Sequence, residues 1–349
     1  MPELVFEQQD FAQGATIALS KLTELMSIHA EEWFSQPIIA FIDELCQRQS
    51  RDALEPVSCI SGSLLRTSLL HGVPGYRLDA YGQDWFLYER PLATAFVPCP
   101  WLSPFWTELV AHFQGILDRR EIQKYCFPLQ AEQAAWQCTG PLFSLIGALL
   151  KYLTAPVKDA QELKKLVKGN DFKIEFGEFL DWKLILIAEY PEIDIFNSRG
   201  RQFRHHQFSG KTFDKKRFYK FDLKGSTFRN CIFSDSEILE TVLNDCVFEH
   251  CRFKNVAFTD ALLAGAQFQD CTLEYVDFEN VIASFAGLPT EKVDDWYRAM
   301  YMVRTSANHV CFSDCDLREG KMEQCTTVYT TLKNSLVESS DFSILTVDD

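Results

Sequence analysis

The chain of 349 residues contains no apolar run near the roughly 18 residues needed to span a bilayer, so no membrane-spanning helix is expected. Its first residues lack a basic stretch followed by an apolar one, so no secretory signal is expected. The 12 cysteines are therefore expected to be reduced thiols in a cytoplasmic protein. At 47% hydrophobic and 24% charged residues, the composition excludes a disordered or collagen-like chain, and the length favours two domains.

Residues 1–198 also lack the short motifs of common catalytic sites. They contain no glycine-rich phosphate loop followed by lysine, no His-Glu-x-x-His, no Gly-x-Ser-x-Gly and no CxxC pair. The alternating residues Tyr76, Arg77, Asp79 and Tyr81 are interpreted as the solvated face of a strand. The sequence therefore assigns no catalytic residue, metal ligand or cofactor.

This first part is expected to form a mainly α-helical (α+β) domain, whose type the sequence does not identify. Apolar residues recur at helical spacing in five segments, 11–26, 28–48, 103–120, 131–153 and 159–167. Strands are expected at 58–70 and 76–88, and 172–190 combines strand-like alternation with an apolar run.

The second part is built on a period of five residues. Reading every fifth position from Phe203 to Phe278 gives only Phe, Leu and Ile. These large residues are here called the centres of the repeats. From Ser226 onward, a column of small residues lies two positions before each centre. Both columns resume at Phe312, one residue out of phase. A period of five fits neither a helix nor a strand, so the chain must turn after each short extended piece. The large and small residues then face the inside of a narrow tube.

This pattern strongly resembles the pentapeptide-repeat family, over 226–278 and 310–347 and partly over 201–224. The resemblance implies a right-handed quadrilateral β-helix with four repeats per coil, here in a domain spanning 199–349. Every fourth repeat would then stack on the one before it. Two columns of core centres follow from this spacing: Phe208, Phe228, Phe248 and Phe268, and Phe213, Phe233, Phe253 and Leu273.

Three cysteines at small positions, Cys231, Cys251 and Cys271, are also spaced by four repeats and should form a buried ladder of thiols. They are interpreted as small hydrophobic residues rather than metal ligands or redox groups. Parallel inward side chains do not converge on one point, whereas zinc requires tetrahedral ligands.

Basic residues occupy the small positions of the first repeats. Because an ion inside a dry tube is costly, 203–218 is expected to be an irregular lead-in with these side chains turned outward. Between 199 and 229 the net charge is +8, in a chain whose overall net charge is −15. The candidate partner-binding basic patch consists of Arg201, Arg204, Lys211, Lys215, Lys216 and Arg217. It could bind nucleic acid or an acidic partner, but pairing with the acidic N-terminal domain is favoured.

The five-residue period is lost at about 281–309. Thr290 can cap a helix in which Val293, Trp296, Tyr297, Met300 and Val303 recur at helical spacing. We expect a helical insertion that either covers one face of the tube or projects as a contact element.

The C-terminal repeats end in apolar residues. An exposed solenoid end invites strand pairing and normally needs a cap. The apolar residues at this end are Phe342, Ile344, Leu345 and Val347. They form either a poorly covered end or an end-to-end homodimer contact of the kind that some relatives make, and the dimer is favoured.

Three functions follow. The first, which we favour, is a non-enzymatic protein-interaction module with the repeat rod as a rigid scaffold. The second is a DNA mimic that binds a type II topoisomerase. From residue 230 onward the net charge is −13, and the resemblance implies this role because Qnr-type relatives are taken to imitate DNA. The third is an enzyme with its site in residues 1–198, which would require a pocket that gathers titratable groups.

Overall fold

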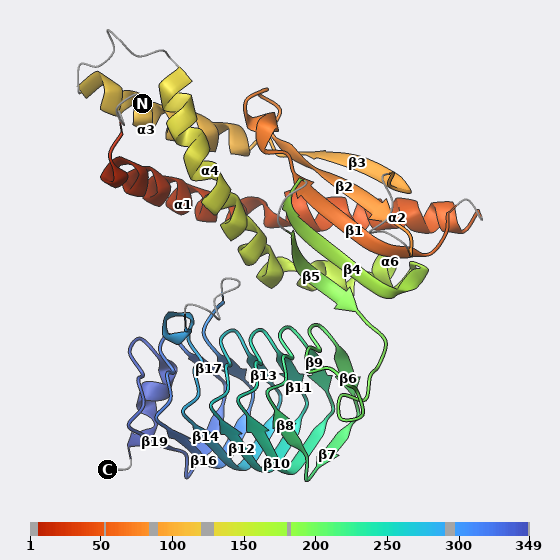
Figure 1. The fold of residues 1–349 in the computed structure, drawn as a ribbon, viewed down its shortest axis with the longest axis vertical. Coiled ribbons are helices and arrows are strands. Elements are labelled where there is room, and N and C mark those ends of the chain that lie inside the picture. The colour runs from red at the N-terminus through yellow and green to blue at the C-terminus, as the bar shows by residue number, and fades with distance from the viewer. Residues whose placement is uncertain are drawn as a thin grey trace. The chain divides into compact units, whose positions relative to one another are not determined.

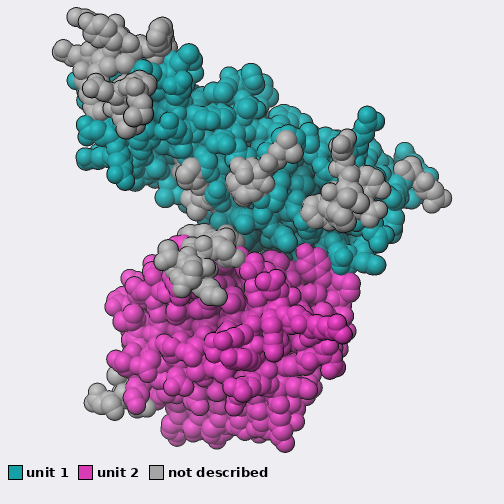
Figure 2. Space-filling view, viewed as in Figure 1, with its two compact units in different colours: residues 1–188 teal, residues 189–349 magenta. Residues whose placement is uncertain are grey.

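The structure is a computed structural model that describes residues 6–51, 54–83, 90–119, 129–179, 183–289 and 297–347. The chain divides into two compact units, Met1–Ala188 and Glu189–Asp349 (Figure 2). This division lies before the boundary at 198 that the change in sequence pattern indicates. The reason is that Ile195, which precedes the repeats, is buried in the core of the second unit.

Unit 1 combines helices with a five-stranded mixed sheet in the order β3-β2-β1-β4-β5 (Figure 1). Strand β1 is antiparallel to β2 and parallel to β4. The helices, with a π-helical turn at Glu31–Ser35 between the first two, are α1 (Gln8–Ala30), α2 (Gln36–Gln49), α3 (Leu102–Arg119), α4 (Leu129–Leu150), α5 (Ala155–Asp159) and α6 (Gln161–Lys165). The strands are β1 (Val57–Leu64), β2 (Gly75–Tyr81), β3 (Ala93–Pro98), β4 (Lys168–Glu178) and β5 (Lys183–Glu189). Among the described residues, no helix is long and apolar enough to cross a membrane.

One face of this sheet forms the core of unit 1. Tyr76 of β2 is fully buried, and its hydroxyl donates a hydrogen bond of 2.7 Å to the backbone oxygen of Trp33. Its ring also contacts Phe176 of β4 edge-on. On the opposite face, Asp79 is only 1% exposed. The interpretation as a solvated strand face is therefore wrong for Tyr76 and Asp79, which are buried, whereas Arg77 and Tyr81 are partly exposed.

Unit 2 is a parallel β-solenoid whose successive coils pair in register, four repeats apart (Figure 1). Phe208 pairs with Phe228, which pairs with Phe248 and then Phe268. Isolated parallel bridges such as Asp222 to Val242 mark another side of each coil. The strands are β6 (Gln207–Ser209), β7 (Thr212–Asp214), β8 (Arg217–Tyr219), β9 (Thr227–Arg229), β10 (Ile232–Leu239), β11 (Val247–Glu249), β12 (Arg252–Thr259), β13 (Gln267–Gln269), β14 (Thr272–Glu279), β15 (Tyr301–Val303), β16 (Ser306–Ser313), β17 (Lys321–Glu323), β18 (Thr326–Val328), β19 (Thr331–Lys333) and β20 (Thr346–Val347).

The backbone explains the five-residue period. The second residue after most centres has a left-handed conformation, for example Asn230 at φ +52° and Asp235 at φ +48°. A single left-handed residue turns the chain after a short extended piece, and Asn and Asp tolerate this conformation best among the residues other than glycine. Each turn directs the next centre into the bore.

The bore is filled by stacked phenylalanine rings. The centroids of Phe208 and Phe228 lie 4.7 Å apart, and those of Phe248 and Phe268 lie 4.8 Å apart. These separations match the spacing of paired strands, about 4.8 Å, because each ring lies above its counterpart in the previous coil. All of these rings are at most 2% exposed.

Two expectations about the solenoid are wrong. The lead-in is not irregular, because β6, β7 and β8 pair in register with the coil that follows. The helix expected around 290–303 does not extend to its predicted end, because Tyr301–Val303 is strand β15 and pairs with β13. Residues 290–296 lie outside the described residues. Across this insertion the register is offset by 34 positions, against 20 between the coils before it.

Candidate interaction surface

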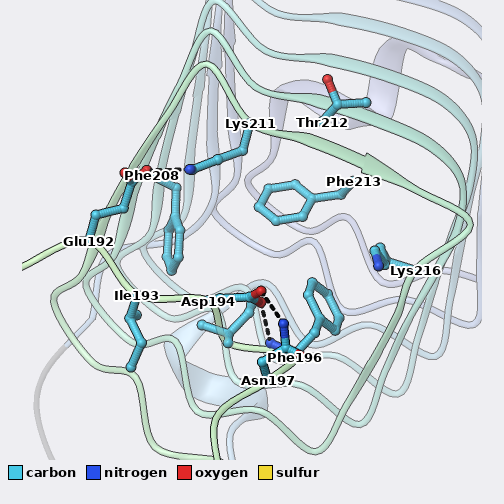
Figure 3. Close-up of a pocket in the computed structure, with 11 residues that line it drawn as sticks. Glu192, Ile193, Asp194, Phe196, Asn197, Phe208, Lys211, Thr212, Phe213 and Lys216 are labelled. Carbon is cyan, nitrogen blue, oxygen red and sulfur yellow. Dashed lines mark hydrogen bonds and ion pairs between the residues drawn. The ribbon is translucent and has the colours of Figure 1, made fainter.

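The first coil is closed by the segment that precedes it. Ile195 is buried, and the ring of Phe196 contacts Phe218 edge-on at a centroid distance of 5.0 Å. Between this segment and the coil lies a pocket of about 450 Å³, into which Phe208 and Phe213 point (Figure 3). The small positions of this coil therefore face a covering segment, which is why large basic residues fit there.

The predicted basic patch occupies this end of the solenoid, and its charges are engaged within unit 2. Five of its six members have partners, which are ion pairs or aromatic rings at 4.8–5.2 Å: Arg204 with Asp222, Lys211 with Glu192, Arg217 with Glu237, Arg201 over Phe221 and Lys216 over Phe196. Lys211 is half-buried, and the others, Lys215 included, are exposed. Because these carboxylates lie beside the basic side chains, the local net charge of the patch is lower than its six Lys and Arg residues alone indicate.

The thiols at the small positions act as hydrogen-bond donors. Cys251 Sγ donates to the backbone oxygen of Phe228 at 3.2 Å, and Cys271 Sγ donates to that of Phe248 at 3.2 Å. Ser236 makes the equivalent bond to Phe213 at 3.0 Å. Cys231, Cys251 and Cys271 are buried, and every described cysteine is a free thiol. These cysteines thus replace serine and threonine in a repeated structural role.

The C-terminal end folds back on itself. A short 3-10 helix, Asp341–Ile344, places Phe342 against Phe312 at a centroid distance of 5.4 Å. Phe342 and Leu345 are buried, whereas Ile344 is 79% exposed. The side chain of Val347 lies outside the described residues, although its backbone belongs to strand β20. Of the residues expected at a dimer contact, Phe342 and Leu345 are thus used within the chain.

One side of the solenoid carries a line of exposed carboxylates, here called the acidic stripe. It lies on the second half of β10, β12, β14 and β16 and the turns that follow, over four successive coils. Within these coils no Lys or Arg occupies an outward position on this side. The stripe consists of Glu237, Glu240, Asp260, Asp277, Glu279 and Asp314.

The neighbouring side carries a column of exposed aromatic residues, here called the aromatic ladder: Tyr275, His309 and Tyr329. The ring centroids of Tyr275 and His309 lie 4.7 Å apart, and those of His309 and Tyr329 lie 4.8 Å apart. Tyr275 is 53% and Tyr329 74% exposed. This column is not visible in the sequence, because the insertion changes the spacing: Tyr275 and His309 align only through the pairing of β14 with β16 across the longer coil.

Another side of the solenoid is covered by the insertion. Leu288 and Tyr297 pack with Ala264, against Leu262 and Ile282. The amino group of Lys224 lies 5.2 Å from the centre of the Tyr297 ring. The described part of the insertion therefore covers one side of the solenoid, which is one of the two predicted alternatives.

Unit 1 contains a polar cluster on the sheet face opposite its core. Asp79 accepts hydrogen bonds from Arg77 at 2.7 Å and from Thr94 at 2.8 Å. Glu175 accepts a hydrogen bond from Ser61 at 3.0 Å and pairs with Lys173. The sequence signal is the alternation of polar residues along β1, β2 and β4, which in β2 was interpreted as a solvated face.

Lys183 joins this cluster from β5. Its amino group donates to the Ser63 hydroxyl at 2.7 Å and to the backbone oxygen of Gly62 at 3.0 Å. Burial lowers the pKa of Lys183 to about 8. Burial also raises the pKa of the neighbouring Cys59 thiol to about 12, which keeps it protonated and unreactive at neutral pH. Among the described residues, no group of three or more His, Cys, Asp or Glu side chains is arranged to hold a metal ion.

Comparison of the sequence with known protein families agrees with the solenoid fold. A family model described as "Pentapeptide repeat region" matches residues 221–286. Residues 221–286 of unit 2 are thus a pentapeptide repeat region.

Solved structures of repeat proteins are also similar to this chain. Trypsin-treated QnrB1, described as a plasmid-mediated fluoroquinolone resistance protein, is 20% identical with a TM-score of 0.28, covering 43% of this chain and 88% of its own. A pentapeptide repeat protein of the cyanobacterium Cyanothece 51142 is 12% identical with a TM-score of 0.22, covering 40% and 92%. No curated protein matches the sequence.

Proposed function

We propose that this protein is a non-enzymatic interaction scaffold whose solenoid binds another protein through the aromatic ladder. The observation that carries the proposal is the stack of Tyr275, His309 and Tyr329 on a surface held by paired strands. Large aromatic side chains are enriched where proteins bind one another, because they bury much area at a small entropic cost. We also propose that the solenoid is right-handed and four-sided, as the resemblance implies.

The backbone strengthens this argument. Tyr275 and Tyr329 have φ values of +55° and +49°, in the left-handed region. Bulky residues are unfavourable in that region, where Asn255 and Asp235 serve the preceding coils of the same column. Stability alone would favour Asn at both positions, so the exposed tyrosines are more consistent with binding than with folding.

A capture experiment tests the proposal. Immobilised full-length protein and the double variant Tyr275→Asn/Tyr329→Asn are incubated with lysate of the native source, and bound proteins are quantified. We expect a bound protein whose recovery falls about tenfold in the double variant, the loss of roughly 1.4 kcal/mol of binding free energy. Tyr301→Thr, on another side of the solenoid, is the matched control. Equal recovery with all three proteins would contradict the proposal.

The acidic stripe favours a second candidate function, a DNA mimic that binds a type II topoisomerase. Aligned carboxylates present negative charge along one line, as a phosphate backbone does. The purified protein should then inhibit DNA supercoiling by such an enzyme at low salt. Asp277→Asn/Glu279→Gln should weaken the inhibition, and Glu249→Gln, on another side, should not. Lack of inhibition by the wild-type protein would eliminate this candidate.

A further inference from the structure

A groove runs beside the aromatic ladder, toward the acidic stripe. It has a volume of about 390 Å³, and its lining includes Tyr275 and the three carboxylates Asp235, Glu237 and Asp277. Its lining includes no lysine or arginine. The groove therefore combines an aromatic wall with a concentrated negative charge.

The carboxylates of the groove are only weakly engaged. Asp235 accepts one hydrogen bond of 2.9 Å from the Asn255 amide. Glu237 pairs with Arg217 at 3.2 Å, but both side chains are more than 60% exposed, and such surface pairs contribute about 0–1 kcal/mol. Within the described residues, Asp277 has no ion pair. A cation that enters the groove thus displaces little existing interaction.

The aromatic wall is suited to a planar cation. His309 stacks on one face of the Tyr275 ring, and the groove is lined by the two coils that precede Tyr275, so the other ring face borders the groove. A guanidinium group can lie flat on an aromatic ring and pair with a carboxylate at the same time. An ammonium group is more strongly hydrated and lacks the planar shape.

We propose that this groove and the aromatic ladder bind an extended, arginine-bearing segment of a partner protein. The guanidinium stacks on the ring face of Tyr275 that borders the groove and pairs with Asp277. This inference rests on the proposed scaffold function and specifies the chemistry of its partner.

Fluorescence anisotropy tests the inference with the full-length chain. The probe is a labelled peptide of alternating arginine and glycine, and the comparison is the same peptide with lysine in place of arginine. At about 0.15 M salt, where exposed charges are screened, the arginine peptide should bind saturably. The lysine peptide should bind about twofold to fivefold more weakly, because an ammonium lacks the planar stacking and forked pairing of a guanidinium and cation–π contacts at exposed sites contribute about 0.5–1 kcal/mol.

Variants locate the binding. Tyr275→Asn and Asp277→Asn should each weaken arginine-peptide binding by about threefold to tenfold, since each removes one of the two contacts of the guanidinium. Asn occupies the equivalent left-handed position at Asn255, so the fold is expected to be retained, as circular dichroism would verify. Tyr301→Thr and Glu249→Gln, on another side of the solenoid, should bind like the wild type.

Three results would overturn the inference. The first is equal affinity for the arginine and lysine peptides, and the second is unchanged binding by Tyr275→Asn. The third is a dimer that dissociates on Tyr275→Asn substitution without any peptide binding, because the groove would then hold a second copy of the chain. Loss of captured protein in the ladder variants without arginine-peptide binding would refute the arginine assignment and leave the scaffold function intact.

Discussion

Phe233 and Phe253 lie face to face, with ring centroids 4.6 Å apart and ring planes within 6° of parallel. They lie one coil apart in the chain, and their backbones pair in parallel register. The same relationship recurs along the bore, so each coil depends on the packing of its neighbours, as in other solenoids.

Removing one ring from the middle of a stack should therefore be costly. Phe248→Ala should lower the free energy of unfolding of unit 2 by about 3–5 kcal/mol, because the ring is 1% exposed and the cavity cannot easily collapse. Far-UV circular dichroism during urea unfolding measures the change. Val328→Ala, at a 45% exposed position, is the control and should change stability by less than about 0.5 kcal/mol. A loss below about 1 kcal/mol for Phe248→Ala would be inconsistent with the stacked bore.

The buried thiols predict a loss of stability in alkali. Burial raises the pKa of Cys315 from its usual 9.0 to about 12. The folded protein thus holds the proton more tightly than the unfolded chain, so this contribution to stability is complete below about pH 9 and is lost as the pH rises toward 12. The urea midpoint of unit 2 should fall as the pH rises above about 9.

Substitution separates this effect from general alkaline unfolding. Cys315→Ser should reduce the fall in midpoint, because a hydroxyl does not ionise in this range and Ser236 shows that serine fits such a position. Cys311→Ser, at an outward position of β16, should leave the fall unchanged. An identical fall in all three proteins would show that Cys315 is not its source.

Two glycines with left-handed backbones should respond differently to alanine. Gly265 has φ +77°, and an added Cβ would lie 2.2 Å from Asp245 Oδ1, whereas Gly210 has φ +62° and open space around that position. Gly210→Ala should cost only the backbone penalty of about 1–2 kcal/mol. Gly265→Ala should cost more, because Asp245 must also move. Equal urea midpoints for the two variants would contradict the close approach.

The polar cluster of unit 1 should stabilise that unit only as a complete set. Asp79→Ala leaves Arg77 and Thr94 without their acceptor, and because the Arg77 side chain is 32% exposed the loss should be about 1–3 kcal/mol. Asp79→Asn keeps one acceptor oxygen and should cost less. Six of the seven tryptophans lie in residues 1–198, so tryptophan fluorescence during urea unfolding reports mainly on this unit. Similar losses for both variants would mean that the carboxylate oxygens are not needed as acceptors.

Local sequence patterns predict much of the fold. The five-residue period of Phe, Leu and Ile indicates the solenoid and its stacking register, because each unit repeats one turn of the backbone. Helical spacing in 103–120 corresponds to α3, in which Phe105, Leu109 and Phe113 are buried. Strand β3, by contrast, was not predicted from the sequence: its positions alternate between buried and exposed, but the apolar residues Phe96 and Pro98 lie on the exposed side, so apolar and polar residues do not alternate.

The sequence by itself determined which residues enter the bore, since a large and a small side chain in every five residues can both be buried only in a tube of short strands. Only the tertiary structure decided the surface. The register across the insertion brings Tyr275 beside His309, and the closing segment engages Lys211 and Lys216 at the first coil. Core positions repeat locally, whereas the outward residues that meet depend on how coils far apart in the chain align.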